Sequence, residues 1–248
     1  MNNPFTLNGK YILITGASSG IGRAIAIECS KIGAKVIITG RNEDNLNLTF
    51  NLLKGVDHQI IKADLTNEED LINLVSEVPH LHGVVHSAGI SNPLPFMFVN
   101  RNELEKIFNP NFFSPVILLQ SLIKKKKVEK NSSIVFISSI SGVYCTSTGG
   151  SVYSASKAAL NAIAKTMALE LSGKSIRVNS INPGMIETNI LENSSISQEQ
   201  LTNELKKYPL KRFGKPNEVA YAAIYLLSDA SQWVTGSNLV IDGGYTLQ

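Results

Sequence analysis

The chain has 248 residues, of which 43% are hydrophobic, and a formal net charge of +3. This length and hydrophobic content suffice to bury the core of one α/β domain, so a single domain over residues 1–248 is expected. So small a net charge argues against nucleic acid as the main partner, and no uninterrupted apolar stretch is long enough to cross a bilayer. The N-terminus lacks a secretion-signal pattern and the two cysteines lack metal-ligand spacing, so we expect a cytoplasmic protein without a metal.

Apolar runs that suit strands alternate with helical patterns along the chain. Strands are predicted over seven segments: Tyr11–Thr15, Lys35–Thr39, His58–Lys62, Gly83–His86, Ser133–Ser138, Arg177–Ile181 and Asn238–Ile241. Helices are predicted to begin near seven residues: Gly20, Glu43, Asn67, Arg101, Phe112, Val152 and Pro216. This alternation predicts a doubly wound α/β fold, with a parallel seven-stranded sheet, helices on both faces and a ligand site at the carboxyl ends of the strands.

The first predicted strand runs into a glycine-rich turn, and a helix follows directly. Gly16 permits the tight turn, Gly20 lets the backbone approach a pyrophosphate, and Gly22 allows close packing of helix on strand. The helix N-terminus presents free N–H groups and a positive dipole end to phosphates. Because the glycine spacing differs from the commoner G-x-G-x-x-G fingerprint, a glycine turn without a ligand is the alternative.

Tyr153 and Lys157 stand four residues apart in a segment rich in Ala and Leu, which predicts one long helix with both side chains on the same face. Lowering the pKa of a phenol from about 10 to about 7 needs roughly 4 kcal/mol. An ammonium about 4 Å away supplies roughly that much at an effective dielectric of about 20. The pair is therefore a candidate acid/base device, and on spacing alone a pair of surface residues is the alternative.

Four separated motifs together resemble the compact single-domain branch of the short-chain dehydrogenase/reductase family. They are Thr15–Gly22, Ser139 with Tyr153 and Lys157, Asn182–Thr188, and Thr235–Gly244. The resemblance runs from about Lys10 to Gly244 and implies a Rossmann-type fold with a nicotinamide dinucleotide cofactor. The residues that would contact this cofactor are Gly16, Ser18, Ser19, Gly20, Ile21, Gly22, Arg41, Asp64, Leu65, Ala88, Gly89, Tyr153, Lys157, Pro183, Gly184, Ile186 and Thr188.

The end of the second predicted strand bears on the choice of cofactor. Where an acidic residue would favour NAD by bonding the ribose hydroxyls, this chain has Gly40 and then Arg41. A guanidinium forms paired hydrogen bonds with a 2′-phosphate, so NADP(H) is expected in preference to NAD(H). Against this, Ser19 stands where many NADP-using relatives carry a second basic residue. Asp64 matches the position that bonds the adenine amine, with a helix cap as the alternative.

The fourth predicted strand ends in His86-Ser-Ala-Gly89, where the family more often has Asn-Asn-Ala-Gly. Ala88 and Gly89 still give the small surface that lets a ribose approach. We expect His86 to hydrogen-bond the neighbouring backbone and not to act in catalysis.

The resemblance also implies a mechanism. Tyr153 would donate its proton to a substrate carbonyl, and Ser139 would hydrogen-bond the same oxygen as charge develops on it. Lys157 would lower the pKa of the phenol and hold the nicotinamide ribose. Ser139 lies fourteen positions before Tyr153, one more than in many relatives, so Ser141 is the alternative.

Asn111 aligns with the asparagine that anchors a proton-relay water in the family. Pro110 stands where an aliphatic residue is usual and removes a backbone donor beside Asn111, which makes Asn109 an alternative.

Residues 187–209 are expected to form a substrate lid, preceded by a turn at Pro183 and Gly184 against the nicotinamide. Thr188 would bond the carboxamide or the phosphates. Apolar residues of this segment would cover a hydrophobic substrate or, equally, form ordinary helix core: Ile190, Leu191, Ile196, Leu201 and Leu205.

The expected activity is reduction of a ketone to a secondary alcohol with NADP(H), most like the 3-oxoacyl-(acyl-carrier-protein) reductases of the family. Acyl carrier protein is acidic, and Lys124–Lys127 and Lys174 are candidates for a basic surface that binds it, although lysines at helix C-termini are usually just solvated. The alternatives are a dehydrogenase of a small alcohol, sugar or secondary-metabolite ketone and, more remotely, a non-catalytic nucleotide sensor or scaffold. The resemblance also implies a homotetramer.

Overall fold

The computed structural model describes residues 3–188 and 198–247, and its strands form a single sheet. The strands are β1 (Tyr11–Thr15), β2 (Lys35–Gly40), β3 (Gln59–Lys62), β4 (Leu81–His86), β5 (Val128–Ile137), β6 (Arg177–Pro183) and β7 (Asn238–Ile241). Every neighbouring pair is parallel, in the order β3-β2-β1-β4-β5-β6-β7. The predicted parallel, seven-stranded sheet is therefore confirmed.

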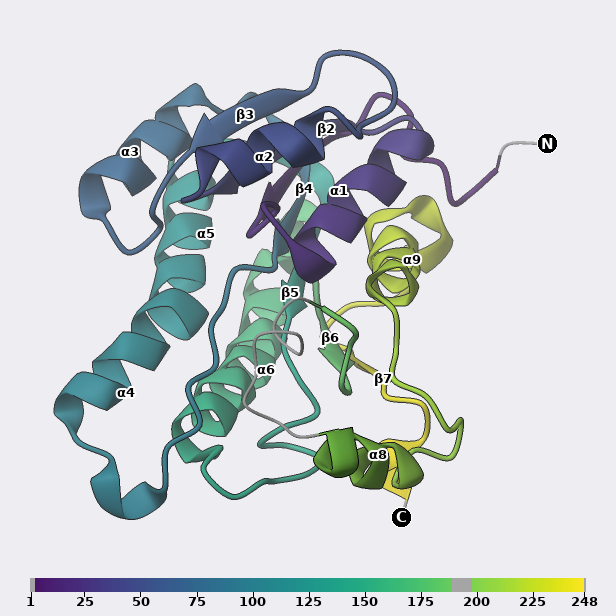
Figure 1. Cartoon of the computed structure of the whole chain (residues 1–248). Helices are drawn as coiled ribbons and strands as arrows, with labels where there is room; N and C mark the ends of the chain where they lie inside the picture. Colours follow the sequence, from purple (N-terminus) through teal and green to yellow (C-terminus); the bar gives the residue numbers. More distant parts are fainter. Residues whose placement is uncertain (1–2, 189–197, 248) are drawn as a thin grey trace.

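Helices cover both faces of this sheet (Figure 1). They are α1 (Gly20–Lys31), α2 (Glu43–Phe50), α3 (Glu68–Glu77), α4 (Arg101–Phe108), α5 (Ser114–Lys124), α6 (Ser151–Leu171), α8 (Gln198–Lys206) and α9 (Pro216–Leu227). One hydrophobic core joins the sheet to α1 and α9, and a second joins it to α3, α5 and α6. Successive residues of β1 alternate between the two cores, as strand geometry requires: Ile12 and Ile14 lie in the first and Leu13 in the second.

Several element boundaries differ from the predictions by one or two residues, and two differ by more. β5 begins at Val128, five residues before the predicted start at Ser133. The prediction missed this part of the strand because its first four residues are exposed or half-buried and so carry no apolar pattern. The helix predicted to begin near Phe112 begins instead as a π-helical turn over Asn109–Phe113, and α5 follows at Ser114. Within residues 3–188 and 198–247, no helix has both the length and the apolar character needed to cross a membrane.

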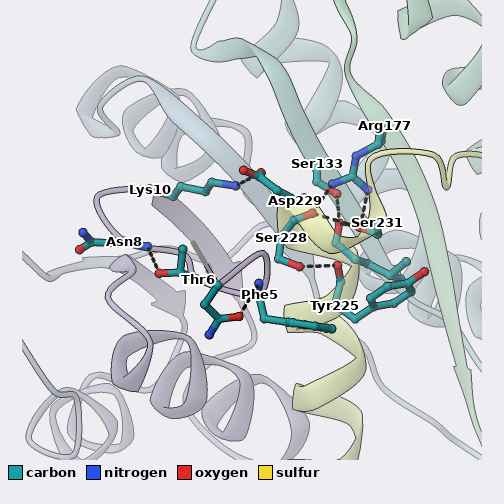
Figure 2. Close-up of polar contacts among 12 residues, drawn as sticks. Phe5, Thr6, Asn8, Lys10, Ser133, Arg177, Tyr225, Ser228, Asp229 and Ser231 are labelled. Atoms are coloured by element: carbon teal, nitrogen blue, oxygen red, sulfur yellow. Dashed lines mark hydrogen bonds and ion pairs between the residues drawn. The ribbon is translucent and has the colours of Figure 1, made fainter. Parts of the chain in front are cut away.

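Polar contacts at the amino ends of the strands attach the N-terminal segment and β6 to the turn after α9 (Figure 2). Lys10 forms an ion pair of 2.6 Å with Asp229. The Arg177 guanidinium donates to the Ser231 hydroxyl at 2.9 Å and to the Ser228 carbonyl at 3.1 Å. The side chains at this edge are thus engaged with one another, and the main cleft lies at the opposite edge, where the strands end.

Candidate active site

A cleft of about 470 Å³ opens at the carboxyl ends of the strands, which is a typical size for a small-molecule site. Its walls contain every residue that the sequence assigned to the cofactor, from Gly16 to Thr188, together with Ser139. Asn111 is not among the wall residues. The walls also contain residues that the sequence did not single out for binding, among them Ala63, Thr66, Ser87, Ile90, Ser91, Ile137 and Met185.

The glycine turn after β1 is built for close backbone approach. Gly16 and Gly20 have φ angles of +65° and +53°, which favour glycine. A Cβ atom on Gly16 would lie 2.8 Å from the backbone of Ala88, and one on Gly22 would lie 2.3 Å from the Gly16 carbonyl oxygen. Neither position tolerates a side chain, so the turn from β1 stays close to both β4 and α1.

The N-terminus of α1 has free donors that a phosphate can use. Ser19 is its N-cap residue, but the Ser19 side chain makes no capping bond, and the first turn contains no acidic residue. By contrast, α2, α3 and α4 are each capped by an asparagine side chain. The N–H groups of α1 and its positive dipole end therefore face the cleft without an anionic partner from the helix itself, which fits a dinucleotide pyrophosphate.

Arg23 supports this turn, a role that was not predicted from the sequence. Its Nε donates to the Thr49 hydroxyl at 2.9 Å, and its guanidinium also donates to the Ser18 carbonyl. The arginine in this way fixes the glycine turn to α2. Its position just after the third glycine was visible in the sequence, but its partner in α2 was not.

Arg41 and Asp64 both line one end of the cleft, and the charge of Arg41 acts on the Asp64 carboxyl. Burial alone would raise the pKa of Asp64, but hydrogen bonds from Thr66 and the nearby charge of Arg41 outweigh it and lower the pKa. The Asp64 carboxylate accepts from the Thr66 N–H at 3.0 Å and from its hydroxyl at 2.8 Å. The helix-cap alternative for Asp64 is wrong, because the Asn67 side chain caps α3.

Lys157 is buried at the other end of the cleft, on the same face of α6 as Tyr153. Its ammonium donates to the Ile137 carbonyl oxygen at 2.9 Å and lies 5.8 Å from the centre of the Tyr153 ring. Only 4% of the residue is exposed, and burial lowers the pKa of Lys157 from 10.5 to about 8. The ammonium therefore sits close to its titration point inside the protein.

The expected lowering of the phenol pKa is wrong for this structure. Burial raises the pKa of Tyr153, and a hydrogen bond with Ser139 offsets that rise only in part. A phenol with a raised pKa stays protonated at neutral pH, which is the form that can give a proton to a carbonyl oxygen. Ser139 is the serine that contacts this phenol, while the Ser141 N–H donates to the Ser139 hydroxyl at 3.1 Å.

Asn111 is fully buried in the π-helical turn and holds the segment after β4. Its side chain accepts from the Ile90 N–H at 2.8 Å and donates to the Ile90 carbonyl at 2.9 Å and to the Ser156 hydroxyl at 3.1 Å. A Cβ atom on Gly89 would lie 3.1 Å from its Oδ1 and 3.2 Å from Nζ of Lys157, so both groups converge on Gly89. Asn109, the alternative, is exposed.

The expected bond from His86 to the neighbouring backbone is also wrong. Both ring nitrogens are buried, and neither has a hydrogen-bond partner in the described part of the chain. The ring stacks on Phe136 at 4.8 Å, and burial lowers the pKa of His86 to about 3. The imidazole is thus neutral and packs as an aromatic side chain.

The segment after β6 forms the last wall of the cleft. The Gly184 N–H donates to the Ile241 carbonyl at 2.9 Å, and the Thr188 side chain lies 3.4 Å from where a Cβ atom of Gly20 would be. Thr188 therefore lies over the glycine turn. The expected lid over 187–209 falls partly outside the described residues, Ile190, Leu191 and Ile196 included, whereas Leu201 and Leu205 are half-buried.

The basic residues proposed for carrier-protein binding do not border this cleft. Lys124–Lys127 directly precede β5 and Lys174 precedes β6, so both groups lie at the amino ends of the strands. The ten residues of β5 separate Lys127 from the cleft by roughly 30 Å, at about 3.3 Å per residue. Lys127 also donates to the carbonyls of Ser76 and Val78 at 3.0 and 2.7 Å.

Comparison with known proteins gives full-length matches. A family model described as enoyl-(acyl carrier protein) reductase matches residues 16–246. The 3-oxoacyl-[acyl-carrier-protein] reductase of Rickettsia prowazekii is 36% identical over 238 residues, 96% of this chain and 97% of that protein. The L-xylulose reductase of Caenorhabditis elegans is 35% identical over 249 residues, 98% of each chain.

Solved structures agree with these matches. A short-chain type dehydrogenase/reductase from Mycobacterium ulcerans has a TM-score of 0.89 and 32% identity, covering 98% of this chain and 92% of that one. A protein from Agrobacterium tumefaciens, provisionally identified as a 2-deoxy-D-gluconate 3-dehydrogenase and holding NADP, has a TM-score of 0.88 and 26% identity, with complete coverage of both chains. The protein belongs to the short-chain dehydrogenase/reductase family of oxidoreductases.

Proposed function

We propose that this protein is an NADP(H)-dependent reductase that converts the ketone of a 3-oxoacyl group, carried on acyl carrier protein, to a secondary alcohol. The observation that carries the proposal is the meeting of Ser139, Tyr153 and Lys157 at one end of a cleft whose other end is formed by Arg41 and Asp64. The first group provides acid/base chemistry and the second suits an adenosine 2′-phosphate.

The residues of the cleft divide the reaction among them. When bound, a reduced nicotinamide supplies the hydride. The protonated Tyr153 donates its proton to the carbonyl oxygen of the substrate, and Ser139 hydrogen-bonds the same oxygen as negative charge develops there. Lys157 holds a positive charge beside the phenol and stabilises the phenolate that proton donation leaves. Asn111 positions the Gly89–Ile90 backbone against Lys157 and would anchor the water through which Tyr153 regains its proton.

Arg41 supports NADP(H) over NAD(H) in this proposal. It lines the cleft directly after β2, next to Gly40, and no acidic side chain stands at that strand end to bond the ribose hydroxyls. Its guanidinium can form paired bonds with a 2′-phosphate. Ser19 adds a hydroxyl donor but no charge, so Arg41 is the residue on which the preference depends.

We also propose a homotetramer in this role, because two groups of large apolar side chains are exposed. Phe96 and Met97, before α4, are 78% and 81% exposed, and Ile117 on α5 is 51% exposed. Trp233 and Leu247, near the edge strand β7, are 100% and 85% exposed. Two such faces suit two different two-fold contacts.

In this assembly the basic residues would lie near a cleft and could bind a carrier protein beside it, whereas within a single chain they lie far from the cleft. A two-fold axis perpendicular to α5 pairs the helix antiparallel with its copy, so the Lys124 end of one chain comes alongside the cleft end of the other. A carrier protein docked on Lys124, Lys125 and Lys174 would then deliver its acyl group to the neighbouring cleft. A cytoplasmic location remains part of the proposal, since Cys29 and Cys145 are both free thiols, as is usual in a reducing compartment.

A sugar or polyol ketone is the second candidate substrate. The L-xylulose reductase of Caenorhabditis elegans is as similar to this chain, at 35% identity, as the carrier-protein reductase at 36%. The same catalytic residues would serve either substrate, so the choice depends on what the cleft mouth admits.

The test is the rate of NADPH consumption with acetoacetyl groups presented on acyl carrier protein and on a short thiol, with L-xylulose and NADH run in parallel. A higher kcat/KM for the carrier-bound substrate with NADPH supports the proposal, and its loss in a Lys124→Glu, Lys174→Glu variant would locate the carrier surface. Turnover of L-xylulose and not of either thioester would contradict the carrier-protein substrate and establish the sugar alternative.

A further inference from the structure

Tyr208 lies just after α8 and directs its hydroxyl at the backbone of the cleft wall. The Met185 N–H donates a hydrogen bond of 2.9 Å to the Tyr208 hydroxyl, and Met185 and Gly184 both line the cleft. The tyrosine itself is 3% exposed and does not line the cleft. It therefore touches the site through one peptide group.

The ring of Tyr208 is fixed by its neighbours. Phe213 meets it edge-on with ring centres 5.5 Å apart, and the Tyr245 ring lies at 4.9 Å. A Cβ atom on Gly184 would lie only 3.3 Å from Cε1 of Tyr208, so the ring packs directly on the Gly184 backbone. A ring held in this way gives its hydroxyl a defined position, which is what a supporting residue must provide.

The peptide between Gly184 and Met185 depends on this hydroxyl for its orientation. Its neighbours are tied by main-chain bonds: the Gly184 N–H donates to the Ile241 carbonyl at 2.9 Å, and the Gly214 N–H donates to the Met185 carbonyl at 3.0 Å. The acceptor for the Met185 N–H is a side chain instead. Because a peptide group is planar and trans, fixing that N–H also fixes the Gly184 carbonyl on the opposite side.

This peptide lies at the catalytic end of the cleft. Gly184 follows β6, whose neighbour β5 leads into Ser139, whereas Arg41 follows β2, four strands away in the sheet. At about 4.8 Å per strand, the two ends are roughly 19 Å apart. A change at Gly184 and Met185 should thus reach the nicotinamide half of a dinucleotide and leave the adenosine half unaffected.

We propose that Tyr208 is a positioning residue for the nicotinamide half of the cofactor. Its hydroxyl sets the Gly184–Met185 peptide in the cleft wall, and the same bond ties the end of the 187–209 segment to that wall. The inference rests on the proposed binding of a nicotinamide dinucleotide, but it does not depend on which ketone is reduced.

The experiment compares Tyr208→Phe, which removes one oxygen and keeps the ring, with wild type. Dissociation constants are measured for NADPH and for adenosine 2′,5′-bisphosphate, which lacks the nicotinamide half, and in parallel for NADH and ADP. The matched control is Tyr245→Phe, whose ring belongs to the same cluster but whose hydroxyl does not contact the Met185 N–H. Thermal unfolding of each variant checks that it is folded.

Removing the side-chain acceptor of the half-buried Met185 N–H should weaken NADPH binding about tenfold in Tyr208→Phe. Binding of the bisphosphate should stay within about twofold of wild type, because the adenosine end is distant and independent. Unchanged NADPH affinity, equal weakening of both ligands, or equal weakening by Tyr245→Phe would each overturn the inference. If wild type bound neither NADPH nor NADH, the proposed function itself would be wrong. If wild type bound NADPH but the variants gave one of the contrary results above, only the inference about Tyr208 would be wrong.

Discussion

The Lys157 ammonium lies 5.8 Å from the centre of the Tyr153 ring, one helical turn along α6, and gives its hydrogen bond to the Ile137 carbonyl. Burial favours the neutral form of both groups: it lowers the pKa of Lys157 to about 8 and raises the pKa of Tyr153. The lysine is thus the member of the pair that titrates closest to neutral pH. Its charge, and not the ionisation of the phenol, should govern the pH dependence of the enzyme.

Turnover should fall as the pH rises through about 8. Lys157, with a pKa lowered from 10.5 to about 8, is protonated below that pH and neutral above it, and the neutral amine cannot stabilise a phenolate. The measurement is kcat/KM between about pH 6 and about pH 10. The range extends to about pH 10 because an ordinary lysine or tyrosine titrates there, which distinguishes it from a group that titrates near pH 8. Lys157→Met should lose activity at every pH, whereas Lys165→Met, at an exposed position of the same helix, should keep the wild-type profile. Constant activity up to the highest pH would contradict the role given to the ammonium.

Arg41→Ala should weaken NADPH binding by about 10- to 100-fold, the loss expected for charge-assisted hydrogen bonds, and leave NADH binding nearly unchanged. The cause is the loss of the guanidinium at the 2′-phosphate end of the cleft. Lys62→Ala is the control, because Lys62 ends β3 nearby but pairs with Glu43 at 3.2 Å and does not line the cleft. Equal losses for NADPH and NADH would show that Arg41 does not read the 2′-phosphate.

Asn111→Ala should lower the free energy of unfolding by about 2–4 kcal/mol, because it leaves the backbone donor and acceptor of Ile90 without their side-chain partner. Turnover should fall as well, since the Ile90 segment adjoins Lys157. Asn109→Ala, an exposed change two residues away, should alter stability by less than about 0.5 kcal/mol. Denaturant unfolding and turnover are measured for both variants, and a loss of turnover in Asn109→Ala but not in Asn111→Ala would restore Asn109 as the functional residue.

The sheet and most of the cleft could be predicted because their signals are local. Buried parallel strands are continuous apolar runs, and residues at the carboxyl ends of such strands meet at one edge. That is why residues as distant in sequence as Gly16, Arg41 and Thr188 were expected together and line one cleft. The same dependence on a local apolar run explains why the early start of β5 was not predicted: Glu129 and Lys130 interrupt that run.

Properties that depend on packing could not be predicted. The spacing of Tyr153 and Lys157 gives their shared face, but the directions of their pKa shifts depend on burial among neighbours from β5 and the segment after it. Two further features also depend on segments whose proximity the sequence does not encode locally: His86 lacks a hydrogen-bond partner within the described residues, and Tyr208 contacts Met185.

The Tyr153→Phe variant, assayed for ketone reduction and for NADPH binding in the same preparation, tests directly whether Tyr153 is the proton donor. The substitution removes only the hydroxyl, so turnover should fall at least about 100-fold, as for removal of a general acid, while NADPH affinity should stay close to that of wild type. Substantial turnover in the folded variant would contradict this role, because the proton would then come from another group.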